Sequence, residues 1–116
     1  MLIKSITLYK IMYCILSDIW AINKNEKLAV FLADANPFLC EEGSADPIVY
    51  NNFVNLYTED KSDDYGYDFI ANYLANLDNY YGNILQHFKT ITFEEYVNKY
   101  KSIISLSDEE LKNKYK

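Results

Sequence analysis

Residues 5–22 read SITLYKIMYCILSDIWAI, a strongly apolar run close to the start of the chain. One apolar stripe recurs there at three- and four-residue spacing and comprises Leu8, Ile11, Met12, Ile15, Ile19 and Ile22. A second stripe lies beside it and comprises Tyr9, Tyr13, Leu16 and Trp20. This spacing is typical of an α-helix, and two adjacent stripes indicate a helix that is packed on two sides. The sequence therefore predicts a central, largely buried helix at the N-terminus.

The same run could also be a membrane span or a signal peptide. Lys10 and Asp18 lie near its middle, where a lipid environment makes charged side chains costly. No small-residue cleavage site closes the run. We therefore expect a core helix rather than a signal or an anchor, and no membrane partner.

Shorter helices are predicted on the C-terminal side of this run, at residues 26–35, 47–57, 67–80, 93–104 and after 107. The signals at their ends are Pro37 after the second helix, Asp46 with Pro47 at the third, Gly82 as the C′ residue of the fourth, and capping boxes at Thr92–Glu95 and Ser107–Glu110. Residues 84–88 are expected to form a turn. No segment shows sustained period-two alternation, so a sheet is not expected. The fold class is therefore all-α: one compact domain over residues 1–116, with five or six short helices around the apolar N-terminal helix.

Charge restricts the classes of partner. The 116 residues include 17 Asp and Glu against 11 basic residues, all of them Lys, for a net charge of −6. Arg is the side chain best suited to bidentate phosphate and guanine recognition. An acidic chain without Arg is a poor nucleic-acid binder, whereas a basic protein would be attracted to it. The other interpretation is that −6 is an ordinary solubility charge for a small domain.

Catalytic and metal-binding patterns are absent from the sequence. His87 is the only histidine and has no Ser or Cys beside it, and the three glycines cannot build a phosphate loop. Cys14 and Cys40 lack metal or redox spacing, so we expect buried free thiols and a reducing cytoplasm. A calcium loop starting at Asp60 would need Gly at the sixth position and Glu at the twelfth, where Tyr65 and Ala71 stand. We expect no enzymatic activity, no metal and no cofactor.

Two acidic loops, at 41–46 and 59–67, are the candidate partner-binding surface. Their candidate residues are Glu41, Glu42, Asp46, Glu59, Asp60, Asp63, Asp64, Tyr65 and Tyr67. Exposed aromatic side chains beside carboxylates would suit docking of a Lys- and Arg-rich protein. Asp46 is the weakest member, because a helix-capping role would already use its carboxylate. The alternative is a solvated loop without a partner, and coding bias explains both the high Tyr content, 12 residues, and the missing Arg.

Three segments resemble a known family. They are LAVFLAD at residues 28–34, GSADP at 43–47 followed by Tyr50, and GYDFI at 66–70 followed by Tyr73 and Leu74. Together with the aromatic first helix they resemble small helical immunity proteins of bacterial contact-dependent growth-inhibition and polymorphic toxin systems, over about residues 8–78. The resemblance implies a protein that occludes a toxin domain by surface complementarity and needs no catalytic machinery. The Tyr-rich C-terminal part departs from the family pattern, so no binding residue is carried over.

The sequence thus predicts an acidic cytoplasmic protein that neutralises a cognate, basic toxin domain. Two other classes stay open. A phage-type inhibitor that imitates nucleic-acid charge should carry carboxylates in a spaced stripe along one face. A structural or interaction domain whose acidity serves only solubility would need no partner.

Overall fold

The computed structural model describes residues 4–39, 43–57, 64–77 and 80–115, and every regular element in these ranges is an α-helix. The helices are α1 (Ser5–Asn23), α2 (Glu26–Ala35), α3 (Pro47–Leu56), α4 (Tyr67–Leu77), α5 (Ile84–Phe88), α6 (Phe93–Ile104) and α7 (Asp108–Tyr115). The predicted all-α class is confirmed. The described helices number seven rather than five or six, because residues 84–88, predicted as a turn, form the short helix α5.

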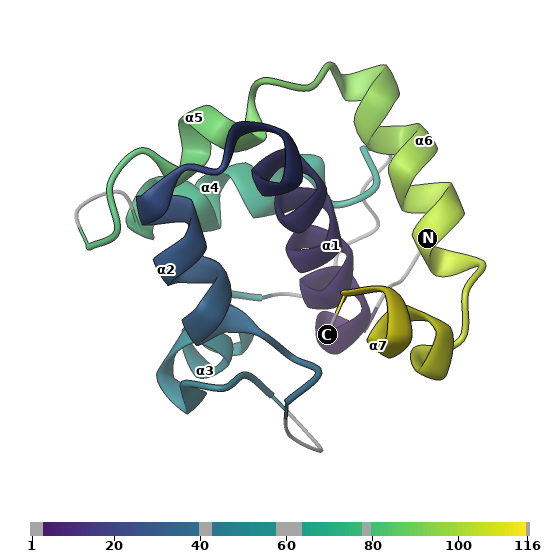
Figure 1. Cartoon of the computed structure of the whole chain (residues 1–116), viewed down its shortest axis with the longest axis horizontal. Coiled ribbons are helices and arrows are strands. Elements are labelled where there is room, and N and C mark those ends of the chain that lie inside the picture. Colours follow the sequence, from purple (N-terminus) through teal and green to yellow (C-terminus); the bar gives the residue numbers. More distant parts are fainter. Residues whose placement is uncertain (1–3, 40–42, 58–63, 78–79, 116) are drawn as a thin grey trace.

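The predicted central helix is α1, and the other helices surround it (Figure 1). Nine of its residues are buried, and it contacts α2, α3, α5 and α6. By length and composition alone α1 could cross a membrane, and half of its 18-residue apolar window is buried within the fold. The two charges that interrupt it lie at the edge of the packing, where Lys10 pairs with Asp108 at 3.2 Å and Asp18 with Lys99 at 3.3 Å.

The apolar stripe of α1 ends one turn earlier than predicted. Ile22 is 88% exposed, and the helix stops one residue later, where Lys24 takes a left-handed conformation with φ of 53°. The C-terminal end of α1 therefore extends beyond the core, and Ile19 is the last buried member of the stripe.

Three of the predicted helix starts are confirmed by side-chain caps. The Asp46 carboxylate accepts the backbone N–H of Ile48, and Pro47 is the first residue of α3. Thr92 and Glu95 exchange both hydrogen bonds of a capping box, as do Ser107 and Glu110. These caps satisfy N–H groups at the helix starts that have no partner within the helix.

The predicted end of the fourth helix, at about Tyr80, lies beyond the described part of α4, which ends at Leu77; residues 78 and 79 lie outside the described residues. The N–H groups of Tyr80 and Tyr81 both donate to the carbonyl of Leu77, at 2.8 and 2.9 Å. Gly82, predicted as the C′ residue, has a φ of +81° and precedes α5.

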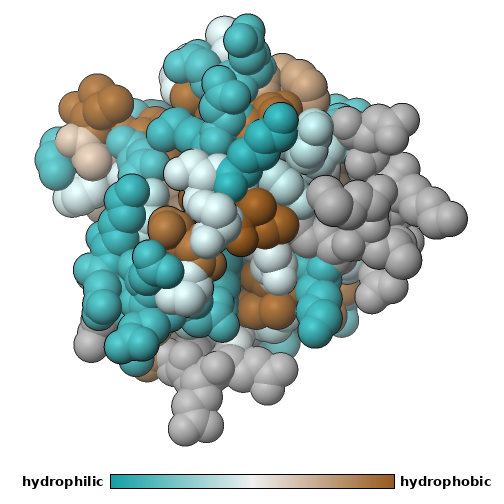
Figure 2. Space-filling view, turned by 90° about the vertical axis from the view of Figure 1, so that its right-hand side faces the viewer, coloured by the Kyte–Doolittle hydropathy of each residue, from teal (hydrophilic) through white to brown (hydrophobic). Residues whose placement is uncertain are grey.

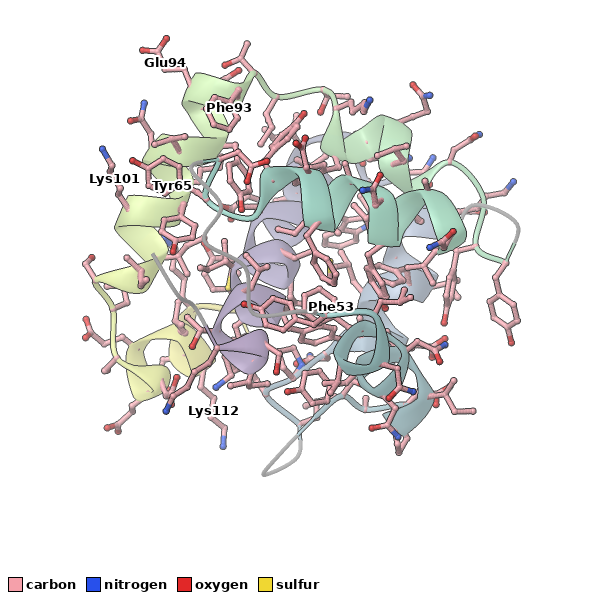
Figure 3. All side chains as sticks on the ribbon, turned by 180° about the vertical axis from the view of Figure 1, so that it is seen from behind. Phe53, Tyr65, Phe93, Glu94, Lys101 and Lys112 are labelled. Carbon is pink, nitrogen blue, oxygen red and sulfur yellow. The ribbon has the colours of Figure 1, made fainter. Side chains whose placement is uncertain are left out.

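Buried tyrosines join helices that are distant in the sequence. The Tyr9 hydroxyl donates to the carbonyl of Ala35 at 2.7 Å, and the Tyr73 hydroxyl donates to that of Val49 at 3.0 Å. Phe53 lies at the centre of one aromatic cluster, with its ring 5.0–5.1 Å from those of Tyr9, Phe69 and Tyr73, the distance at which edge-to-face pairs are favourable (Figure 3). Part of the high Tyr content therefore serves internal packing.

Candidate functional site

Four of the nine predicted partner-binding residues lie in the part of the chain that the structure describes: Asp46, Asp64, Tyr65 and Tyr67. The other five, Glu41, Glu42, Glu59, Asp60 and Asp63, lie outside the described residues. Cys40 lies outside them as well.

Asp46 and Asp64 both have local structural partners. Asp46 caps α3, as predicted. Asp64 accepts the backbone N–H of Gly66 at 3.0 Å and that of Asp68 at 3.1 Å, which stabilises the start of α4. A side-chain hydrogen bond with Asp64 and the negative charge of Asp64 raise the pKa of the Asp68 carboxyl above its usual value. Both predicted residues therefore have a folding role, and their role in binding stays a prediction.

Tyr65 and Tyr67 are partly buried, so the expectation that they are exposed is wrong. Tyr65 has a φ of 60°, its carbonyl accepts the Tyr96 hydroxyl at 2.7 Å, and its ring packs edge-on against Tyr100 at 5.2 Å. The ammonium of Lys101 lies 6.0 Å from the centre of the same ring (Figure 3). These contacts hold Tyr65 between the start of α4 and α6.

Tyr67 belongs to an aromatic cluster between α4, α5 and α6. Its ring centre lies 5.1 Å from Phe88, 5.4 Å from Phe93 and 5.2 Å from Tyr96. Burial raises the pKa of the Tyr96 phenol, so this hydroxyl stays a hydrogen-bond donor. The partners of Tyr67 come from residues 88–96, and sequence spacing around residue 67 carries no signal for them.

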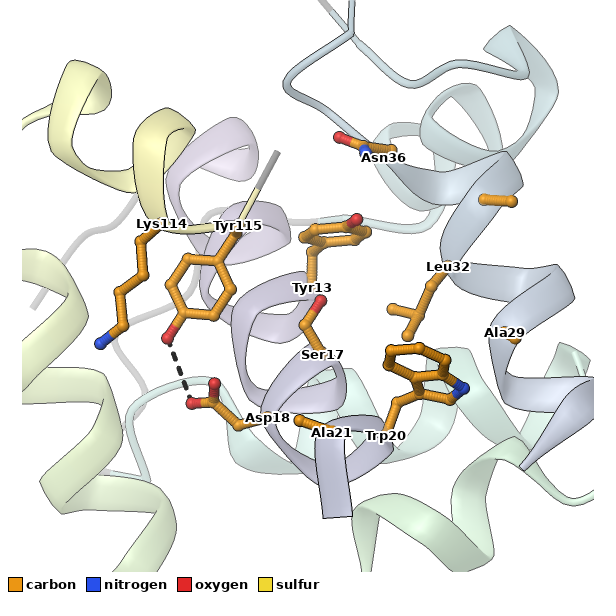
Figure 4. Close-up of a pocket in the computed structure, with 11 residues that line it drawn as sticks. Tyr13, Ser17, Asp18, Trp20, Ala21, Ala29, Leu32, Asn36, Lys114 and Tyr115 are labelled. Atoms are coloured by element: carbon orange, nitrogen blue, oxygen red, sulfur yellow. Dashed lines mark hydrogen bonds between the residues drawn. The ribbon is translucent and has the colours of Figure 1, made fainter. Parts of the chain in front are cut away.

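A groove of about 430 Å³ runs between α1, α2 and α7 (Figure 4). Three aromatic side chains, Tyr13, Trp20 and Tyr115, form much of its lining. The carboxylate at its edge, Asp18, already accepts the Tyr115 hydroxyl at 3.1 Å and pairs with Lys99. The groove therefore offers apolar and aromatic surface, with its carboxylate engaged by the protein itself.

The described groups offer little chemical reactivity. The Nδ1 atom of His87 accepts a hydrogen bond from the Asn23 amide at 3.1 Å, and the hollow beside it is lined by amides and Lys27. Cys14 is a buried free thiol, as predicted, and burial together with the nearby Asp18 charge raises its pKa to about 12. A thiol with so high a pKa is a poor nucleophile at neutral pH. Among the described residues no three His, Cys, Asp or Glu side chains could hold a metal ion together.

Exposed apolar side chains lie on several helices. On the side of the molecule where α6 and α7 lie, hydrophilic side chains predominate and apolar ones emerge between them (Figure 2). On α3 three large apolar side chains are exposed: Ile48 is 65% exposed, Leu56 49% and Val54 37%. α6 exposes two, Phe93 and Ile104, at 45% each.

Comparison of the chain with protein-family models, with curated proteins and with solved structures found no match.

Proposed function

We propose that this chain is an acidic binding protein that neutralises a basic toxin domain inside a bacterial cell. The observation that carries the proposal is the charge: 17 carboxylates against 11 Lys and no Arg. Five of the carboxylates fall in the two short stretches 41–42 and 59–63, on either side of α3 in the sequence. A concentration of one sign of charge accelerates encounter with a partner of the opposite sign and suppresses the wrong partners.

The resemblance to small helical immunity proteins supports the same function. One of the segments that carry it, GSADP at 43–47, also has a local structural explanation. Gly43 adopts a φ of +94°, the Ser44 hydroxyl accepts the N–H of Tyr50 at 3.0 Å, and Asp46 caps α3. The segment thus fixes the start of α3, which is useful to any helical scaffold.

Such a protein can neutralise a toxin simply by covering the active or binding site of the toxin domain. The helices around α1 supply a scaffold, and the connections between helices are where binding proteins commonly carry their contact residues. The exposed carboxylates in the first turns of α6 and α7 are followed by Lys in the last turns of the same helices. That mixture of signs is unlike a row of phosphates, so the charge pattern favours a protein partner over imitation of nucleic acid.

The test uses the toxin domain encoded by the neighbouring reading frame, produced as an inactive variant for binding and as the active form for growth assays. We expect co-expression of this chain to restore growth and the two purified proteins to form a stoichiometric complex. Growth arrest in the presence of the chain, with no complex between the purified proteins, would overturn the proposal.

A charge-reversal pair locates the electrostatic contribution. We expect Glu59→Lys with Asp60→Lys to slow association more than the matched control Glu94→Lys with Glu109→Lys, which makes the same change of charge on α6 and α7. Asp64 is left unchanged, because it caps α4 and its loss would destabilise the fold.

A further inference from the structure

One side of helix α3 packs against the core, and the other side is exposed to solvent. Val49 and Phe53 are its buried residues, and the hydroxyl of Tyr73 ties Val49 to α4. The exposed residues of α3 after Pro47, here called the α3 face, are Ile48, Asn51, Asn52, Val54, Asn55 and Leu56. The α3 face is therefore apolar and amide-bearing surface held on a fixed support.

The α3 face carries no charge, although the chain as a whole is 24% charged. α3 has no charged residue among its ten, and the neighbouring α4 has one, Asp68, among its eleven. α6 carries four among its twelve residues and α7 five among its eight. Coding bias acts on the whole chain, so it does not explain why charge is missing from α3 while α6 and α7 are rich in it.

Depletion of charge with retention of exposed apolar side chains is the signature of the centre of a protein interface. Solvent-facing helix positions are ordinarily filled by Glu and Lys, as they are on α6 and α7. Asn side chains can donate and accept hydrogen bonds with a partner, and they lose less rotamer freedom on burial than long charged side chains. A partner can therefore exclude water from the α3 face without burying an unpaired charge on it.

We infer that the α3 face is the contact centre for the basic toxin domain, an inference that rests on the function proposed above. Its occupant is a basic protein surface that offers apolar and hydrogen-bonding groups to the α3 face. The basic character is argued from charge complementarity, because this chain has a net charge of −6. The net negative charge of the chain guides the encounter, and the α3 face provides the desolvated contacts that set the lifetime of the complex.

The support of the α3 face suits this role. The ring of Phe53 packs against three aromatic rings from α1 and α4, so the helix is held before any partner arrives. A preorganised surface loses little conformational entropy on binding. Substitutions on the α3 face should accordingly change partner affinity with little effect on the fold.

The experiment places two charges in the middle of the α3 face. Asn51→Lys with Asn55→Lys changes two exposed positions one helical turn apart. The matched control, Asn98→Lys with Ser102→Lys, makes the same change of charge at the same spacing on the exposed side of α6. Both pairs reduce the overall negative charge equally, so they weaken long-range steering alike.

We expect the α3 pair to weaken binding of the inactive toxin domain by about 30-fold or more, mostly through faster dissociation, as desolvated hot-spot positions do. The α6 pair should change affinity by no more than about 3-fold, through the association rate, which is the usual effect of charges at or beyond a rim. Equal effects of the two pairs would overturn the inference and leave the proposed function standing. If the wild-type chain forms no complex, the proposed function fails first.

Hydrogen exchange of the unmodified chain gives an independent readout. In the complex, the amides of residues 48–56 should exchange at least about tenfold more slowly than in the free chain, and those of residues 98–104 should be unchanged, since bound surface opens less often. Unchanged exchange over α3 in a formed complex would overturn the inference even if the substituted chains failed to fold.

Discussion

At the scale of single residues, tyrosine hydroxyls determine how several helices meet. Tyr9 is fully buried, and its hydroxyl donates to the carbonyl of Ala35, the last residue of α2. Carbonyls at a helix C-terminus have no partner within the helix, so this bond satisfies an acceptor that burial would otherwise leave without one. Burial also raises the pKa of the Tyr9 phenol, which keeps it protonated and able to donate.

The first prediction follows from that bond. Tyr9→Phe leaves the buried carbonyl of Ala35 without its donor, so the free energy of unfolding should fall by about 1–3 kcal/mol. Tyr80→Phe is the control, because Tyr80 is 83% exposed, and it should change stability by less than about 0.5 kcal/mol. Urea unfolding followed by circular dichroism measures both. Equal stabilities of the two variants would show that the Tyr9 hydroxyl does not support the fold.

A second prediction concerns Cys14. Its side chain is buried and its pKa is raised to about 12, so at pH 8 the thiolate is a very small fraction of the thiol. In a Cys40→Ser background, a disulfide reagent should leave Cys14 unmodified in the native protein and modify it fully in denaturing urea. Rapid stoichiometric modification without denaturant would contradict the burial of this residue.

At the scale of elements, capping residues fix where helices begin and make one of them sensitive to acid. The Glu95 carboxylate accepts the N–H of Thr92 at 2.9 Å, and that bond lowers its pKa from the ordinary value of 4.5. A carboxyl whose pKa is lower in the folded state stabilises the fold at pH values above its unfolded pKa. The contribution is lost as the pH falls through the folded pKa.

The third prediction is that Glu95→Gln lowers the midpoint of thermal unfolding at pH 7 and has progressively less effect as the pH falls from about 4.5 toward 3. Glu94→Gln provides the control on the adjacent position of α6, where attraction to the helix dipole is lost but no capping hydrogen bond is recorded among the described contacts. A difference between wild type and Glu95→Gln that stays constant from pH 7 to pH 3 would contradict the capping-box explanation.

The helices that could be predicted from the sequence are those with local signals. α1 has two apolar stripes, α3 has Asp46 with Pro47, and α6 has the Thr92–Glu95 capping box. α5 could not be predicted, because its apolar residues, Ile84, Leu85 and Phe88, span little more than one helical turn; in the fold it packs against α4 and α1. Periodicity needs several turns before it separates a helix from a turn.

The candidate site was harder to predict than the fold. Asp and Glu side chains can either cap helices or contact partners. The residue type alone therefore did not show that Asp64 caps α4. The burial of Tyr67 depends on Phe88, Phe93 and Tyr96, which lie 21 to 29 residues away in the sequence. The α3 face left one signal that could have been read, the complete absence of charge from residues 47–56.

At the scale of the whole molecule, charge is distributed unevenly around a single core. The core is built on α1, whose contacts with four other helices fix their relative positions. Charged residues are concentrated on α6 and α7 and missing from α3, so the domain has sides of different chemical character. A molecule of this kind can use its overall field for encounter and an uncharged surface for lasting contact, which separates the rate of association from the rate of dissociation.

The last prediction tests that separation with salt. At low ionic strength the field of a chain with a charge of −6 extends about 30 Å from the surface, whereas near 1 M salt it is screened within about 3 Å. Association of the chain with the inactive toxin domain should therefore slow by about tenfold or more between 20 mM and 500 mM NaCl, measured by stopped-flow or surface binding. Dissociation should change by less than about threefold, because the α3 face that opposes it carries no charge.

The pair Asn51→Lys with Asn55→Lys should have the opposite effect to salt. Compared with wild type at one salt concentration, it should change the association rate modestly and the dissociation rate strongly. An association rate that is independent of salt would show that the acidity of the chain serves solubility alone, and a dissociation rate that rises steeply with salt would place charged pairs, rather than the α3 face, at the centre of the contact.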